Sequence, residues 1–238
     1  MNRWSIYIDI EGFSETYETG AQPFRSLRAL MTAIYDIGSR VYRESPDRIF
    51  AHQLGDGFVI VGEFGWPVLE QPCSIAVALI RAVLLRGGVA KAAIAEGEFA
   101  DVSGCYPPTI RELHGRAAGG AFPLGGGLMT VFPVMGTALI NAFKLLHRPS
   151  TLSGALLLLR REDIVRLPEG VPSTVEGDSC YIDWIHAGYE HLEQLHDMAG
   201  IHRPPPGVME EILRAYIRAN RVSEAWAANT RRFLGVDS

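Results

Sequence analysis

The segment that most restricts the fold is an aspartate flanked by two glycines, between two short apolar runs. Residues 48–54 and 58–63 are each suited to a β-strand, and Gly55-Asp56-Gly57 separates them. Glycine permits the positive φ angles of a tight turn, so the pattern predicts a β-hairpin with Asp56 at its tip. The hairpin would therefore place a carboxylate at an edge of the predicted sheet.

The hairpin lies within a succession of strand-like and helix-like segments. Residues 4–10 alternate as a strand does, and residues 24–42 carry apolar side chains three and four positions apart, as one face of a helix does. After the hairpin, residues 73–85 are almost continuously apolar and residues 89–94 resemble another strand. The order is strand, helix, strand, strand, helix, strand. It predicts an α/β (α+β) fold with a ferredoxin-type βαββαβ sheet flanked by helices.

The second half of the chain is less regular. We divide the chain into a core of residues 1–166 and a C-terminal helical extension of residues 167–238 that packs on it. The expected segments are a functional or mobile loop at 101–127, a strand at 128–134, a helix at 137–146, a strand at 155–159, a polar linker at 168–178 and a final helix near 208–234.

Composition excludes several classes of protein. The 238 residues carry a formal net charge of −5, so nothing attracts the chain as a whole to nucleic acid or to an anionic membrane. No apolar stretch predicts a membrane span, and the first residues lack the pattern of a signal peptide, so we expect a cytoplasmic protein. The three cysteines, Cys73, Cys105 and Cys180, lack the spacing of a zinc site; we expect them to be reduced and structural.

The predicted sheet brings two carboxylates to one edge. Asp9 ends the first strand, and Asp56 occupies the hairpin tip. Two carboxylates form a hard-oxygen site for Mg²⁺ or Mn²⁺ when the phosphates of a substrate complete the coordination shell. The alternative is that Gly55-Asp56-Gly57 is only a turn, and spacing alone leaves both interpretations open.

A family resemblance favours the metal site. Residues 7–14, Tyr-Ile-Asp-Ile-Glu-Gly-Phe-Ser, resemble the first-strand motif of class III nucleotidyl cyclases, and residues 54–58, Leu-Gly-Asp-Gly-Phe, resemble the hairpin of that family. Gly136 and Ala142 resemble its glycine-led helix, so the likeness covers roughly residues 4–165 in the family's order of elements. It implies a class III cyclase-like fold, and a head-to-tail homodimer with its active sites at the interface.

The resemblance also implies roles for individual residues. One protomer would hold two metal ions, Mn²⁺ or Mg²⁺, with Asp9, Asp56 and the carbonyl of Ile10, and would bind a nucleoside triphosphate. Its partner would supply groups from the Gly136 helix. Positions that usually carry an asparagine and an arginine align with Ile140 and Lys144, so the catalytic candidates are Asn141, one place away, and Lys144. Both could instead face solvent.

Further residues are candidates for the triphosphate. Backbone N–H groups of residues 11–14, including those of Phe13 and Ser14, lie at the predicted start of a helix, where phosphates bind readily. Glu11 itself is expected to be exposed rather than bound to metal. Four basic residues could contact phosphates: Arg86, which is also a catalytic candidate, Lys91, Arg160 and Arg161. Each such residue alone is more often a surface charge.

Two departures from the family concern the base. Purine-specific members have a lysine four residues before the hairpin aspartate and an aspartate three residues before the helix glycine. This chain has His52 and Pro133 at those places. His52 is thus either a base contact or an ordinary strand histidine. The shortened layout and the tail around Trp184 resemble the pyrimidine cyclases of the Pycsar antiphage system, which make cyclic UMP or cyclic CMP for a separate effector protein.

Other interpretations are a purine cyclase and an inactive cyclase fold that senses a nucleotide or dimerises. A diguanylate cyclase would need a second acid after Asp56, and a P-loop would need lysine and serine after the glycines at 125–127. Four histidines of the tail lack the spacing of a metal motif, so we expect them to be solvated. They are His186, His191, His196 and His202.

Overall fold

The chain forms a mixed sheet with helices on both faces. The computed structural model describes residues 2–13, 20, 22–44, 49–64, 68–114, 121–131 and 134–236. The elements in chain order are β1 (Asn2–Ile10), α2 (Gln22–Asp36), η1 (Ile37–Val41), β2 (Phe50–Leu54), β3 (Gly57–Phe64), α3 (Glu70–Leu84), β4 (Ala90–Glu98), β5 (Ala100–Asp101), η2 (Ser103–Cys105), α4 (Pro108–His114), β6 (Ala121–Leu124), β7 (Gly127–Thr130), β8 (Val134–Met135), α5 (Thr137–His147), β9 (Leu157–Arg160), η4 (Arg161–Arg166), β10 (Ser173–Glu176), β11 (Ser179–Ile182), α6 (Glu190–Ala199), α7 (Pro206–Ala219) and α8 (Glu224–Phe233).

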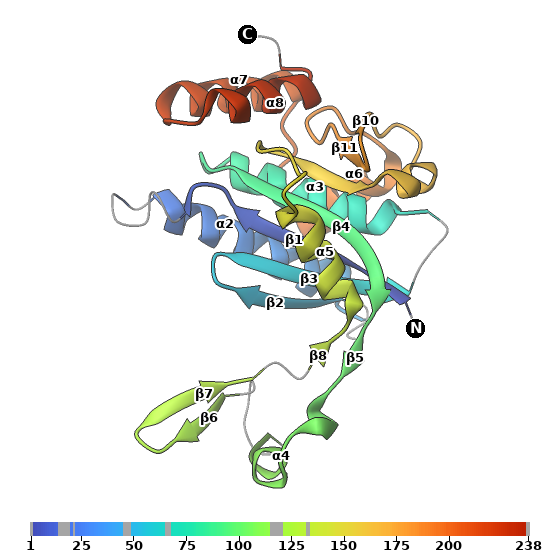
Figure 1. Ribbon diagram of the computed structural model, residues 1–238. Helices are drawn as coiled ribbons and strands as arrows, with labels where there is room; N and C mark the ends of the chain where they lie inside the picture. Colours follow the sequence, from blue (N-terminus) through green and yellow to red (C-terminus); the bar gives the residue numbers. More distant parts are fainter. Residues whose placement is uncertain are drawn as a thin grey trace.

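The main sheet has seven strands in the order β10-β11-β9-β4-β1-β3-β2. Its neighbouring strands are antiparallel, except that β4 and β9 run parallel. Figure 1 shows α5 crossing one face of this sheet while α2 and α3 cover the other. The order β1-α2-β2-β3-α3-β4 is the predicted one, and the predicted α/β fold class is confirmed.

Strand β1 is central because its side chains are apolar on both faces. Ile6 and Ile8 belong to the larger core, which α2 and α3 cover. Tyr7 points to the opposite face and belongs to a second, smaller core beneath α5. Burial on both sides explains the run of apolar residues in this strand, since a strand with one solvated face would alternate strictly.

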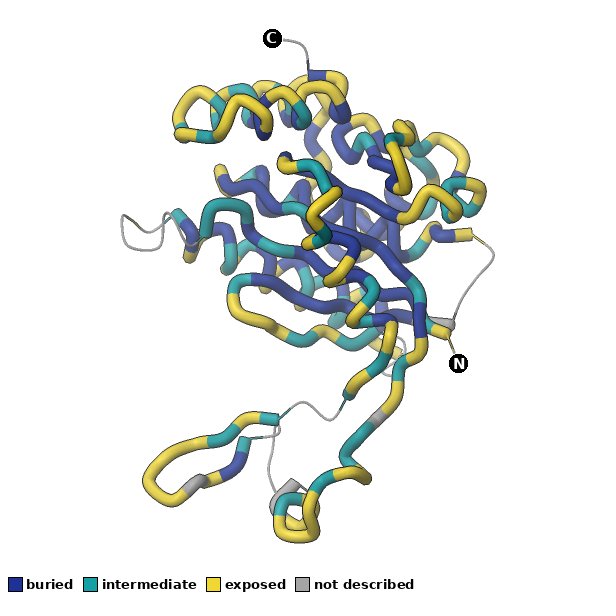
Figure 2. The backbone as a smooth tube through the Cα atoms, viewed as in Figure 1, coloured by how far each residue is buried: buried dark blue, intermediate teal, exposed yellow. Residues whose placement is uncertain are grey.

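The described residues of 99–114, 121–131 and 134–136 form an arm that projects from the end of β4 (Figure 1). This arm is largely exposed or half-buried, as the tube in Figure 2 shows, although Phe122 is buried. Gly136 closes the arm with a φ angle of 154°, and a Cβ atom there would collide with the carbonyl of Glu98. Only glycine therefore permits the close approach of the two chain segments that join the arm to the sheet.

The arm and the tail contain elements that the sequence patterns did not reveal. The loop expected at 101–127 includes η2, α4 and β6, and the linker expected at 168–178 includes β10. These elements have three to seven residues, too few to show a periodicity. The final helix is in fact two helices, α7 and α8, since residues 220–223 leave helical geometry, and α6 precedes them.

The C-terminal extension continues the core sheet rather than only covering it with helices. Strand β11 pairs with β9 and carries β10 at the sheet's edge. The buried Arg81 of α3 donates from Nε to the carbonyl of Trp184 (2.9 Å) and from Nη2 to those of Ile185 (3.1 Å) and Ala187 (2.6 Å). The predicted domain boundary between residues 166 and 167 therefore separates strands of one continuous sheet, and it stays a prediction.

Several smaller expectations are also settled. His196 is 1% exposed and burial lowers its pKa to about 4, so the expectation that the tail histidines are all solvated is wrong. The three cysteines are free, with Cys73 and Cys180 buried, whereas Cys105 is exposed and does not help to build the core. Across the described residues, no helix combines the length and the apolar character that a membrane crossing requires.

Candidate active site

Strand register brings the two aspartates to one edge of the sheet. The pairing of β1 with β3 ends at Ile8 and Phe58, so Asp9 and Gly57 come next along the two strands. A Cβ atom at Gly57 would lie 2.8 Å from the carbonyl oxygen of Ile8 and 2.9 Å from Oδ1 of Asp9. Glycine therefore lets the hairpin that carries Asp56 lie directly against the Asp9 carboxylate.

The electrostatic environment of Asp9 shows the two carboxylates acting on each other. Burial, and then the negative charge of Asp56, raise the pKa of Asp9 to about 6, against smaller opposing effects of Lys91 and His147. Burial and the same two aspartates raise the pKa of Tyr7 to about 12. A half-buried pair of carboxylates that repel each other is a place where a cation lowers the free energy.

The donor set fits a hard divalent cation that a substrate helps to hold. No group of three or more His, Cys, Asp and Glu side chains suited to a metal occurs among the described residues. Two carboxylates with substrate phosphates are, however, a common arrangement for Mg²⁺. Ile10, whose carbonyl is the third predicted ligand, ends β1 beside Asp9 and pairs with Ala90 of β4. The metal roles of Asp9, Ile10 and Asp56 remain predictions.

The structure contains a polar network beside Asp9 that the sequence did not predict. Oε1 of Glu11 lies 2.7 Å from Nζ of Lys91, and Oε2 accepts a hydrogen bond of 2.8 Å from Nε1 of Trp226 in α8. The side chain of Glu11 is only 15% exposed, so its expected exposure is wrong. Lys91, a predicted phosphate ligand, is bonded to Glu11 instead. Nothing in the sequence links Trp226 to a residue 215 positions earlier.

This network predicts a role for Trp226 in stability. The rings of Trp226 and Tyr216 lie 6.1 Å apart. Trp226→Phe keeps an aromatic ring there but removes the N–H group that donates a hydrogen bond to Glu11. A hydrogen bond to a charged group contributes about 1.5–3 kcal/mol, and we expect the free energy of unfolding to fall by about that amount. Urea unfolding measures it. In a Glu11→Gln background the same substitution should cost less, and equal costs in both backgrounds would contradict the contact.

One face of the sheet gathers the aromatic side chains near Asp9. The ring of Tyr7 lies 5.1 Å from that of Phe143 and 5.3 Å from that of His147, and the latter two stack at 4.3 Å. Tyr7 pairs with Val59, which pairs with His52, so His52 lies on this same face. His147, which the sequence did not single out, acts electrostatically on Asp9. The signal in the sequence that could have indicated His147 is its place directly after the helix expected at 137–146.

Of the two catalytic candidates of α5, Asn141 lies away from the aspartates of its own chain. Nδ2 of Asn141 donates to the carbonyl of Glu96 (2.8 Å), so Asn141 does not simply face solvent. Glu96 pairs with Trp4, five residues along β1 from Asp9, which at the rise of a strand is roughly 17 Å. A single chain therefore does not bring Asn141 to Asp9. Lys144 is exposed and lies between Phe143 and His147, whose rings are close to that of Tyr7, two residues before Asp9.

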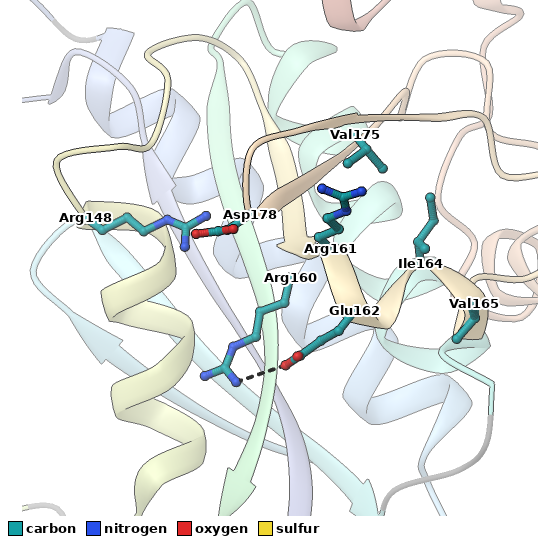
Figure 3. Close-up of a pocket in the computed structure, with 8 residues that line it drawn as sticks. All are labelled: Arg148, Arg160, Arg161, Glu162, Ile164, Val165, Val175 and Asp178. Atoms are coloured by element: carbon teal, nitrogen blue, oxygen red, sulfur yellow. Dashed lines mark hydrogen bonds and ion pairs between the residues drawn. The ribbon is translucent and has the colours of Figure 1, made fainter.

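Arg160 lines a cavity of about 640 Å³ that also involves Arg148 and Arg161 (Figure 3). Nη1 of Arg160 lies 3.4 Å from Oε1 of Glu162, and both side chains are well exposed. Strand β9 is parallel to β4 and ends at Arg160, whereas Asp9 pairs with Lys91 near the start of β4. Arg160 thus lies toward the opposite end of the sheet from Asp9.

The other phosphate candidates are also dispersed. The ring of Phe13 lies 6.1 Å from that of Phe24, while Ser14 and Pro133 fall outside the described residues. The N–H of Glu11 donates to the carbonyl of Val89 (2.9 Å), so the first of the four predicted phosphate donors is already bonded. Arg86 is exposed and lines a different cavity, described below.

No protein-family model and no curated protein matches the chain. Among similar solved structures, the guanylyl cyclase domain of the RhoGC fusion protein from Blastocladiella emersonii has 10% identity and a TM-score of 0.43, covering 76% of this chain and 94% of its own. The adenylyl cyclase CyaB from P. aeruginosa has 12% identity and a TM-score of 0.38, covering 76% and 92%. A class III adenylyl cyclase-like ATP-binding protein from Pseudomonas aeruginosa has 12% identity and a TM-score of 0.40, covering 82% of this chain and 40% of its own.

These TM-scores lie below 0.5, so the fold rests on the strand order and register of the chain itself. The three structures are named for guanylyl or adenylyl cyclases. The resemblance to pyrimidine cyclases stays a prediction.

Proposed function

We propose that the protein is a nucleotidyl cyclase, which converts a nucleoside triphosphate to a 3′,5′-cyclic monophosphate and pyrophosphate. The observation that carries the proposal is the half-buried pair Asp9 and Asp56, in which the charge of one raises the pKa of the other. A carboxylate pair at a sheet edge is suited to hold the cations that accompany a triphosphate. The motifs around both aspartates resemble those of class III cyclases.

The proposed reaction is an in-line displacement at phosphorus. The ribose 3′-oxygen forms a bond to the α-phosphorus, and the bond from that phosphorus to the oxygen shared with the β-phosphate breaks, releasing pyrophosphate. The hydroxyl proton leaves to solvent. Asp9 and Asp56 hold the divalent cations and orient the phosphates. Bound Mg²⁺ or Mn²⁺ supplies a lower pKa for the hydroxyl and neutralises negative charge on the phosphates.

The site requires a second copy of the chain in this proposal. Asn141 is bonded to the carbonyl of Glu96, well along the sheet from Asp9, whereas a head-to-tail partner could supply both Asn141 and Lys144 to a nucleotide held at Asp9. Ile140 and Phe143, beside them on α5, are 43% and 45% exposed. Apolar side chains that stay exposed next to a site are typical of a surface that another chain covers. We therefore propose a homodimer with the active sites at its interface.

The proposed substrate is a pyrimidine nucleotide, UTP in preference to CTP. His52 lies on the Asp9 face of the sheet, and burial lowers its pKa, so the ring is neutral at pH 7. A neutral imidazole offers one donor and one acceptor to a base, whereas the lysine of purine-specific cyclases is a cation. The cyclic product would act as a second messenger in antiviral defence, made in the cytoplasm and read by a separate effector.

An assay with four substrates tests the proposal. We expect protein incubated with Mn²⁺ or Mg²⁺ and each of ATP, GTP, CTP and UTP to give cyclic UMP as the main product, identified by mass spectrometry. Cyclic AMP or cyclic GMP as the main product would retain the cyclase and overturn the pyrimidine preference. Absence of any product with either metal would instead favour an inactive fold that binds a nucleotide.

A further inference from the structure

A second cavity, of about 950 Å³, lies on the other side of the sheet from α5. It is bordered by α2, by the end of α3 and by the chain that follows α6. Helices α2 and α3 pack on the sheet face of Ile6 and Ile8, whereas Asp9 shares the opposite face with Tyr7. The cavity is therefore separate from the candidate active site.

Arginine side chains line this cavity. Arg25 and Arg28 come from α2, and Arg86 follows α3. Within the described part of the chain, none of the three arginine side chains makes a hydrogen bond or an ion pair. The acidic lining residue is Asp36, and its Oδ1 lies 3.2 Å from Nη2 of Arg40. In a chain with a net charge of −5, such a local cluster of arginines attracts anions.

Apolar side chains, three of them alanines, also line the cavity. Ala29 and Ala33 line it from α2, Ala82 and Leu85 from the end of α3, and Ile201 from the tail. Small side chains leave room for a flat group to approach the helices closely. A concave surface that combines apolar side chains with a few polar groups suits a small molecule, whereas a nucleic acid or a membrane meets a broader surface.

The border of the cavity is held in place before any ligand arrives. Nε2 of Gln22, the first residue of α2, donates to the carbonyl of Arg86 at 3.1 Å. Nη1 of Arg40 donates to the carbonyl of Ala199 at 2.8 Å, which joins η1 to the end of α6. These contacts fix the spacing of the three segments that line the cavity, and a preformed site loses less entropy on binding.

We propose that this cavity binds a small organic phosphate, with the phosphate on Arg25, Arg28 and Arg86 and the apolar part of the ligand on the alanine-lined interior. Guanidinium groups match the oxygens of a phosphate in pairs, so three arginines are suited to hold it. A nucleoside monophosphate has both the charge and the flat apolar ring system. The inference does not depend on cyclase activity.

The test uses a variant without the Asp9 and Asp56 carboxylates, so that UMP binding at the candidate active site does not contribute to the measured heat. In the full-length Asp9→Asn/Asp56→Asn variant, titration calorimetry with UMP is expected to show binding that the further change Arg25→Gln/Arg28→Gln weakens by about tenfold or more, because two charge-assisted contacts are lost. The control is Arg218→Gln/Arg221→Gln, which also removes two exposed arginines three positions apart and should leave binding unchanged.

Three outcomes would overturn the proposal. The first is no heat from UMP at millimolar concentration, and the second is equal weakening by the control pair, which would indicate a general effect of net charge. The third is equally tight binding of inorganic phosphate, which would remove any role for the apolar interior. Circular dichroism and thermal melting of each variant establish that a loss of binding does not come from unfolding.

Discussion

Asp56→Asn is expected to lower the rate of cyclic nucleotide formation by about a thousandfold or more, which corresponds to about 4 kcal/mol of transition-state stabilisation. The substitution keeps the size of the side chain in the hairpin turn but removes one of the two charges that would hold the cations. The rate is measured by mass spectrometry of the cyclic product under saturating Mn²⁺. A loss that raised only KM would place Asp56 in substrate binding rather than in the chemical step.

The matched control for this change is Asp197→Asn. Asp197 is exposed on α6, outside the candidate site, and the same change of an acid to an amide there should leave the rate within twofold of that of the wild type. Asp56→Asn should also remove the repulsion that contributes to the raised pKa of Asp9. Retention of full activity by Asp56→Asn, with its fold intact, would contradict the metal role of the hairpin.

The order of helices and strands along the core was predictable because each of these elements has its own local signal. The apolar run of β1, the helical period of α2 and the two glycines around Asp56 specify a βαββ unit without reference to distant residues. Short elements such as β10 lack such a signal, since four residues do not establish a period. Their formation depends on a neighbouring strand that lies ready to pair, and here β11 supplies it.

The aspartate pair could also be predicted, but its surroundings could not. The partners of Glu11 come from β4 and from α8, and those of Arg81 are three carbonyls more than 100 residues away. Tertiary contacts of this kind leave no pattern in the chain. Asn141 and Lys144 were placed by resemblance, and the distance of Asn141 from Asp9 has a physical consequence: if Asn141 acts on a nucleotide held at Asp9, two chains must meet.

Asp9→Asn is expected to stabilise the protein in the absence of metal, although it should abolish activity. The folded state raises the pKa of Asp9 from its ordinary 3.8 to about 6 and therefore binds a proton more tightly than the unfolded chain does. As pH rises between these values, the unfolded chain loses its proton first, so the free energy of unfolding of the wild type falls, and this loss is complete above about pH 7. Asparagine cannot ionise, so the variant avoids the loss.

The expected gain at pH 8 is about 1–2 kcal/mol, once the partial exposure of the carboxylate is allowed for. Urea unfolding in EDTA at pH 5 and pH 8 measures it, and the difference between variant and wild type should be larger at pH 8. Adding Mn²⁺ with a nucleoside triphosphate, whose phosphates complete the coordination shell, should reverse the order of stability, because a ligand at a hundred times its Kd contributes about 2.7 kcal/mol to the wild type alone. A variant that is less stable than the wild type in EDTA at pH 8 would contradict the repulsion at this site. An order that Mn²⁺ and the triphosphate together do not change would contradict the metal site.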